Sequence, residues 1–246
     1  MQYRIILSLL FLVSILPETF SAQRDSSAER IFSLIYNQQF TEAEKLLEAS
    51  RKEIDPFYFS VLKLDLFWWK YSLSRTKTDA QNLNFLLDQL AETPGNSTNK
   101  KITELIRLSY QMRFEVKQKN YLNAFFVRSD VQKQLELLQK EKIVIPADQQ
   151  KLFDLYVILL QYSEHANPFS FSKKTEKKAD LIMKLTRYCA GEDLIVSTLA
   201  HYFLGRIYTK IEKQPEKGRE HFQVLAQKFP QNRLFTDLAK GLAVDF

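Results

Sequence analysis

The chain has 246 residues and a mass of 29.0 kDa, and its 45% hydrophobic and 26% charged residues supply a sizeable core and exclude a compositionally disordered protein. Only 5 residues are glycine, which disfavours glycine-rich phosphate loops and turn-rich β-architectures and favours helices. The 35 Lys and Arg against 29 Asp and Glu give a net charge of +6, a modest bias towards acidic protein surfaces, lipid headgroups or anionic polymers.

Residues 1–22 have the pattern of a signal peptide. Arg4 supplies the positive start, the run from Ile5 to Leu16 is apolar apart from two serines, and Pro17 ends it. The apolar run is shorter than the roughly 20 residues that span a bilayer, and no later segment is long and uncharged enough to do so. We therefore predict cleavage near Ala22 and export to the periplasm or the medium, with no transmembrane segment in residues 23–246.

The chain has a single cysteine, Cys189. A lipoprotein anchor needs a cysteine directly after the signal peptide, so we do not expect a lipid anchor. One cysteine also excludes an internal disulfide, and stability must come from packing. Export makes nucleic acid a poor candidate partner, and the sequence has no zinc-finger, RNA-recognition or basic-zipper pattern.

Prolines mark the edges of the predicted helices. Because proline is tolerated in the first turn of a helix and breaks its interior, we expect Pro56, Pro146 and Pro215 to open helices and Pro230 to follow one. Apolar residues recur at helical spacing between these marks. The predicted helices are 26–37, 41–54, 57–73, 78–92, 100–118, 120–141, 147–164, 174–190, 193–211, 215–229 and 232–243.

Capping residues support several of these starts. Thr41 with Glu44 matches a capping box, and Thr78 and Asp193 are placed to cap their helices. We predict loops at 92–99 and 165–174, where turn-forming residues gather. Neither loop is accompanied by a change in composition, so residues 23–246 are predicted to form one continuous helical array.

The helices pair into about five hairpins, and the last pair resembles the tetratricopeptide repeat (TPR). The resemblance rests on small, aromatic and closing residues at repeat positions: Leu204, Gly205, Tyr208, Gly218, Phe222 and Pro230. The link between these two helices is one residue longer than usual. A second copy lacks the first-helix glycine and contains Leu34, Phe40, Ala43, Leu47 and Pro56. The resemblance implies an α-solenoid whose first helices line a concave groove that holds a peptide or protein segment.

The repeat register suggests a binding stripe on the last pair. It places Tyr202, Arg206 and Lys210 at i, i+4 and i+8 on the groove side of one helix. Arginine offers a rigid fork for carboxylates and tyrosine an amphipathic contact surface, which suits an acidic or C-terminal peptide. The competing interpretation is a solvated helix face with two ordinary cations.

Extending the register upstream gives further candidates near the groove. These are Trp69, Tyr110, Arg113, Asp154 and Gln161, whereas Trp68, Met112 and Leu159 are expected to face the core. An exposed Trp69 would stack on a sugar or anchor a peptide. Packing of both tryptophans in the core or between hairpins is the alternative.

No catalytic motif is present. The three histidines are far apart in sequence and lack metal-ligand spacing. The last hairpin allows His201 and His221 to approach each other, and we interpret them as ordinary packed or exposed residues rather than ligands. Cys189 is either a nucleophile activated by a basic neighbour or, as we expect, a small buried hydrophobe. We predict no enzyme activity, no metal and no cofactor.

Two functional hypotheses follow. The first is an exported TPR-like adaptor that mediates protein–protein interaction in the cell envelope. The alternative is a carbohydrate or anionic-polymer binding module, based on the 13% aromatic content, the Trp68-Trp69 pair and the net charge of +6.

Overall fold

A computed structural model describes residues 19–92, 97–141, 143–166 and 176–242, and these residues form helices and no strand. The prediction of an all-α protein is confirmed. Among the described residues, no helix is long and apolar enough to cross a membrane. The helices are α1 (Thr19–Tyr36), α2 (Phe40–Ala49), α3 (Pro56–Ser74), α4 (Lys77–Glu92), α5 (Thr98–Lys117), α6 (Tyr121–Lys140), α7 (Ala147–Ala166), α8 (Lys178–Cys189), α9 (Leu194–Arg206), the π-helix η1 (Ile207–Ile211), α10 (Pro215–Lys228) and α11 (Arg233–Ala239).

Several helix starts follow the sequence signals. The Asp55 side chain accepts a hydrogen bond from the Phe57 amide, and Pro56 occupies the first position of α3. The Asp193 carboxylate caps α9 by accepting from the Val196 amide at 2.9 Å. Each cap satisfies an amide that has no partner within the helix.

Two predicted caps are wrong. Helix α2 already begins at Phe40, so Thr41 lies inside the helix, and the N-cap Gln39 makes no side-chain capping bond. At α4, the Thr76 hydroxyl rather than Thr78 accepts from the Asp79 amide, at 3.2 Å. In both cases the helix starts one residue earlier than the polar residue that suggested its start.

Two helix boundaries shift by five residues or more. Helix α1 begins at Thr19 rather than residue 26, and α2 ends at Ala49 rather than residue 54. The predicted helix 193–211 becomes α9 followed by η1. Residues 1–18, which include most of the predicted signal peptide, lie outside the described residues. The same holds for 93–96 and 167–174 of the predicted loops.

The links within the hairpins repeat one backbone geometry. Three-residue links join α1 to α2, α5 to α6 and η1 to α10, and the middle residue of each is left-handed: Gln38 (φ 62°), Lys119 (φ 61°) and Lys213 (φ 56°). In the first two links, an amide bonds back five residues, from Gln39 to Leu34 and from Asn120 to Glu115, both at 2.9 Å. This is the Schellman ending, which satisfies the last carbonyls of a helix.

A small residue also recurs at the fourth position of the second helix in four hairpins. These residues are Ala43, Ala80, Ala124 and Gly218, all buried or partly buried. A small side chain at this position lets the two helices of a hairpin approach closely. The same hairpin therefore recurs in the middle of the chain, where the sequence shows little of the repeat signature.

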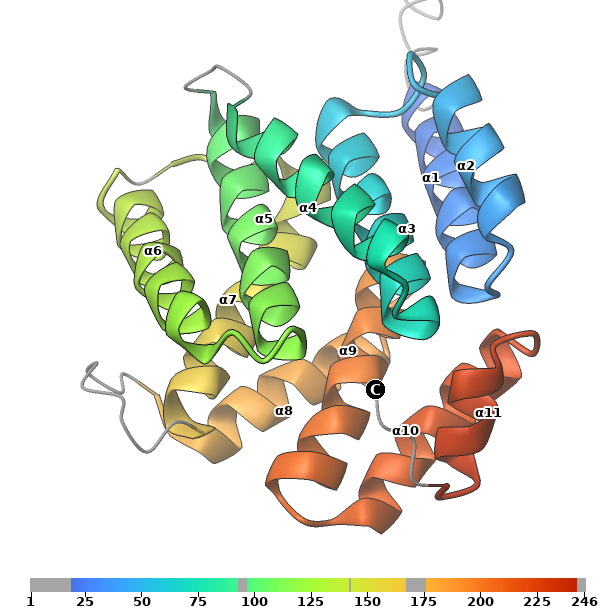
Figure 1. Cartoon of the computed structure of the whole chain (residues 1–246), viewed down its shortest axis with the longest axis vertical. Coiled ribbons are helices and arrows are strands. Elements are labelled where there is room, and N and C mark those ends of the chain that lie inside the picture. The colour runs from blue at the N-terminus through green and yellow to red at the C-terminus, as the bar shows by residue number, and fades with distance from the viewer. Residues whose placement is uncertain (1–18, 93–96, 142, 167–175, 243–246) are drawn as a thin grey trace, which may run out of the picture.

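The hairpins form two groups that meet at the centre of the molecule. Helix α3 contacts α1 and α2, and α5 contacts α3 and α4, whereas α9 contacts α7 and α8 (Figure 1). Helix α1 also contacts α9, which joins the first group to the second. The first helices α1, α3 and α5 therefore pack in sequence, and α9 returns to contact α1.

Asn232, the N-cap residue of α11, connects this last helix to the end of α1 by hydrogen bonds. Its side-chain amide donates to the Tyr36 carbonyl at 2.7 Å, and its Oδ1 accepts from the Gln38 side chain at 2.9 Å. Behind these bonds, the rings of Tyr36, Phe229 and Phe235 pack together. These contacts close the arrangement between α1, α10 and α11.

Candidate binding site

A buried carboxylate lies where the first helices meet. Asp65 on α3 is 3% exposed and accepts hydrogen bonds from the hydroxyl groups of Tyr110 on α5 and Tyr36 on α1. Burial raises the pKa of Asp65 to about 6, and the Tyr110 hydrogen bond and the charge of Arg113 limit the rise. Burial likewise raises the pKa of the neighbouring Tyr156 to about 12.

Arg113 lies beside this carboxylate with its guanidinium enclosed by aromatic rings. Its Cζ is 4.0 Å from the ring centre of Tyr110, 4.6 Å from that of Trp68 and 5.9 Å from that of Phe203. The Nε and Nη2 atoms are buried and have no hydrogen-bond partner among the described residues. The aromatic faces and the field of Asp65 stabilise the cation, while part of its hydrogen-bonding capacity stays unused.

A pocket of about 720 Å³ opens in front of Arg113, at the ends of α3, α5 and α9. Among the described residues, its walls combine aromatic and apolar side chains with five cations and contain no carboxylate. The lining residues are Trp68, Tyr71, Arg75, Met112, Arg113, Val116, Lys117, Gln118, Lys119, Tyr121, Tyr202, Phe203 and Arg206. We call this the basic aromatic pocket.

Three of the predicted binding residues line this pocket, namely Arg113, Tyr202 and Arg206. Trp69 and Tyr110 lie behind it, each 1% exposed. Trp69 packs against the rings of Tyr202 and Phe235, with centroids 5.8 and 5.7 Å away. The expectation that Trp69 and Tyr110 line an accessible groove is therefore wrong, because both side chains are packed inside the protein. In the case of Trp69, residues of α9 and α11 cover the ring.

The other three predicted residues lie elsewhere. Asp154 and Gln161 line a second pocket of about 660 Å³ between α7, α8 and the start of α9, whose lining carries charges of both signs. Lys210 is exposed in η1 and is not among the residues that line the basic aromatic pocket. The predicted i, i+4, i+8 stripe assumes 3.6 residues per turn, and the wider π-helical turn breaks that phase.

Sequence reasoning missed several lining residues of the pocket. Trp68 lies in the core as expected, at 7% exposure, and its ring also forms part of the pocket wall, which the sequence did not indicate. Arg75 and Lys119 occupy left-handed positions at the ends of α3 and α5, where no motif marked them. Their only signal was position, because each follows the last residues of a predicted first helix.

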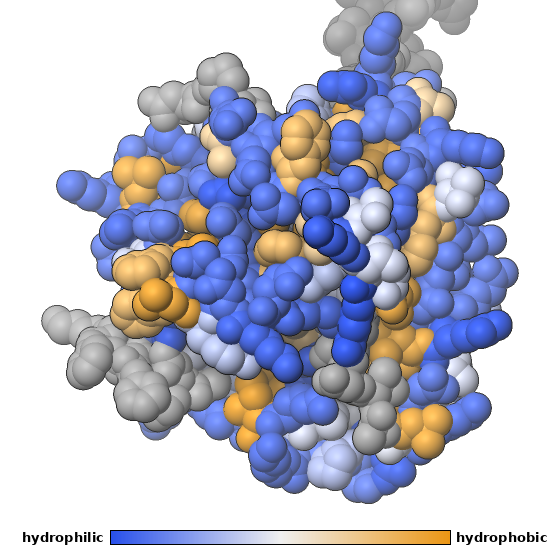
Figure 2. Space-filling model, in the orientation of Figure 1, coloured by the Kyte–Doolittle hydropathy of each residue, from blue (hydrophilic) through white to orange (hydrophobic). Residues whose placement is uncertain are grey.

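An exposed apolar surface adjoins the pocket on α6. Tyr121, Leu122, Phe125 and Phe126 are between 56% and 68% exposed, and Figure 2 shows hydrophobic side chains over α6 on an otherwise mostly hydrophilic face. Tyr121 belongs to both the pocket and this surface. We call these four residues the α6 apolar surface. Contiguous exposed apolar residues of this kind are typical of interaction sites.

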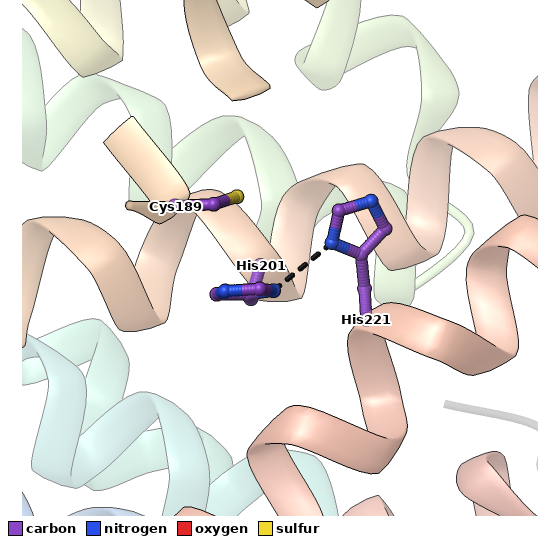
Figure 3. A group of neighbouring side chains, drawn as sticks. All are labelled: Cys189, His201 and His221. Atoms are coloured by element: carbon purple, nitrogen blue, oxygen red, sulfur yellow. Dashed lines mark hydrogen bonds between the residues drawn. The ribbon is translucent and has the colours of Figure 1, made fainter. Parts of the chain in front are cut away.

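A separate cluster joins the two histidines of the last hairpin to the cysteine. The Nδ1 atoms of His201 and His221 are 3.0 Å apart (Figure 3), which confirms their predicted approach. Cys189 is partly buried next to them. Burial raises the pKa of its thiol to about 12, which is the opposite of the shift that a nucleophilic cysteine needs.

Comparisons of the chain with protein-family models, with curated proteins and with solved structures found no match. The function is therefore inferred from the chemistry of the described surfaces. Of these surfaces, the basic aromatic pocket combines charge, aromatic walls and an arginine with unused hydrogen-bond donors.

Proposed function

We propose that the chain is an exported TPR-like scaffold without catalytic activity that binds an acidic segment of a partner protein. Export rests on the signal-peptide pattern of residues 1–22. The TPR-like assignment rests on the repeat positions around Gly205 and Gly218, and the recurring hairpin geometry supports it. The single observation that carries the binding function is the basic aromatic pocket.

The charge of the pocket selects an acidic ligand. In the part of the chain that the structure describes, five cations and no carboxylate line it, so its potential attracts anions and disfavours cationic segments. Arg113 contributes its charge to this potential from the pocket wall. A ligand carboxylate is attracted to such a cluster of guanidinium and ammonium groups.

The apolar part of the site indicates that the ligand also carries hydrophobic residues. Met112 and Phe203 line the pocket, and the α6 apolar surface continues from it through Tyr121. Buried aromatic and arginine anchors commonly dominate the energy of an interface. We therefore expect a segment in which carboxylates and apolar side chains are interspersed.

The carbohydrate alternative loses the support of its tryptophan pair. Stacking on a sugar required an exposed Trp69, and this ring is 1% exposed. Trp68 is 7% exposed and its ring already packs against Arg113. Neither indole offers the open face on which a sugar would stack.

The test is the binding of a fluorescent ten-residue peptide of alternating glutamate and leucine, followed by fluorescence anisotropy. Arg206→Ala removes a pocket cation, and Lys210→Ala removes an exposed cation four residues further along. We expect at least tenfold weaker binding for R206A and less than a twofold change for K210A. Equal losses in the two variants would show that only net charge matters and would overturn the proposal.

Two further peptides separate an acidic protein segment from a simple polyanion. Replacing the glutamates by glutamines should abolish binding, since the charges are required. Replacing the leucines by glutamines should weaken it, since the apolar walls lose their contacts. Full binding of the leucine-free peptide would favour an anionic polymer over a protein partner.

A further inference from the structure

We infer that Cys189, His201 and His221 form a binding site for a borderline-soft transition metal such as Zn²⁺. The three side chains come from the end of α8, from α9 and from α10, and they converge on one point (Figure 3). One candidate ligand atom from each residue lies within 4.8 Å of those of the other two. The inference does not depend on the basic aromatic pocket, to which none of these residues contributes.

The spacing of the nitrogens suits tetrahedral coordination. With zinc–nitrogen bonds of about 2.0–2.1 Å, two tetrahedral ligands lie about 3.4 Å apart. The Nδ1 atoms of His201 and His221 are 3.0 Å apart, so a few tenths of an ångström of movement would admit the ion between them. A zinc-bound thiolate sits about 3.6 Å from such a nitrogen, and the cysteine sulfur is already within 4.8 Å.

Neighbouring groups hold the two imidazoles in place. His201 also hydrogen-bonds the backbone of Cys189, and the His221 ring stacks on Tyr208 with an angle of 9° and centroids 5.8 Å apart. Outer contacts of this kind orient metal-binding histidines and fix the nitrogen that faces the ion. The close approach of α9 and α10 sets the distance between the two rings.

The chemistry of the donor set favours zinc over calcium or magnesium. One thiolate and two imidazoles are soft and borderline ligands, whereas calcium and magnesium require oxygen. Among the described residues, the ammonium of Lys228 is the charged neighbour that bears on His201, and it donates to Ser197 Oγ at 3.2 Å. A thiolate at Cys189 would offset this positive charge. Three protein ligands leave a fourth position for water or an external ligand.

The first experiment measures Zn²⁺ affinity of the full chain by competition with a chromophoric chelator. We expect one equivalent of zinc with a Kd in the micromolar range or below. His221→Gln should weaken binding at least tenfold, because it removes one of three ligands. His165→Gln is the matched control, since His165 bonds the Glu176 carbonyl and lies outside the cluster, and its affinity should stay within twofold of the wild type.

The second experiment uses Co²⁺ as a spectroscopic probe. Its main readout is the spectrum of the wild-type protein, so it does not depend on the folding of a variant. The wild type should show a thiolate-to-cobalt charge-transfer band together with the visible bands of tetrahedral cobalt. Cys189→Ser should lose the charge-transfer band. No zinc binding at micromolar concentrations, a wild-type cobalt spectrum without a thiolate band, or equal losses in H165Q and H221Q would each overturn the inference.

Discussion

At the scale of single residues, Asp65 has the most unusual environment. Its carboxylate is 3% exposed and receives hydrogen bonds from two tyrosines, yet desolvation still raises its pKa to about 6. An unfolded aspartate has a pKa near 3.9. Between these values the folded chain binds more protons than the unfolded chain, so the free energy of unfolding should fall as pH rises from about 4 to 6.

Asp65→Asn tests whether Asp65 causes this fall in the free energy of unfolding. The amide keeps the shape of the side chain and removes its ionisation, so the variant should lack the fall in stability. The difference in unfolding free energy between wild type and variant should change in favour of the variant by about 2 kcal/mol between pH 4 and pH 7, measured by urea denaturation. Asp130→Asn is the control, because Asp130 is exposed. Parallel pH profiles for wild type and D65N would contradict this account of Asp65.

The sequence marked some residues of this centre and missed others. The repeat register found Arg113, Tyr202 and Arg206, because they lie on the inward faces of first helices. It did not find Asp65, whose signal was a single acid within the apolar run of α3, between Leu64 and Leu66. A charge in such a run is buried only if other helices supply partners, and helical periodicity does not show those partners.

At the scale of elements, the α9–α10 hairpin shows how small residues set the approach of two helices. A Cβ atom at Gly205 would come within 2.7 Å of the Phe222 ring. Helix α9 continues into η1, whose wider turns absorb an added residue. This accounts for the link that the sequence showed as one residue longer than usual, and it moves Lys210 away from the pocket.

Gly218→Ala should destabilise the protein. The added methyl group would overlap Thr209 Oγ1 and lie 2.9 Å from the Gly205 carbonyl oxygen, a backbone atom that cannot turn away. Overpacking of about 1–3 kcal/mol should exceed the roughly 1 kcal/mol gain in helix propensity, and thermal unfolding would report the net loss. Gly191→Ala is the control, because its nearest contact is a single carbonyl at 3.3 Å. A G218A variant as stable as G191A would show that the helices can move apart freely.

Helix positions were largely predictable from the sequence, and their ends less so. Prolines and apolar spacing located each helix, because both act within a few residues of the backbone that they affect. Thr41 and Thr78 suggested caps two residues too late, because a threonine in the first turn resembles one at the cap. The change to a π-helix after Arg206 depends on contacts between helices and had no local signal.

At the scale of the whole molecule, closure decides which surface is accessible. Contacts of α1 with α9, and of Asn232 with Tyr36 and Gln38, connect the two ends of the chain. These pairs are separated by nearly the whole chain, so hairpin patterns do not predict them. The inward aromatic residues consequently fill a core, and the proposed binding site is the basic aromatic pocket with the α6 apolar surface.

Site-specific photocross-linking tests most directly whether a ligand binds at the basic aromatic pocket. A photoreactive phenylalanine analogue replaces Val116 at the pocket or Val224 on α10, two valines that are 49% and 40% exposed. With the glutamate–leucine peptide, we predict cross-links from position 116 that excess unlabelled peptide removes, and only background from position 224. Equal cross-linking from both positions, or none from position 116 under conditions where the peptide binds, would contradict binding at the basic aromatic pocket.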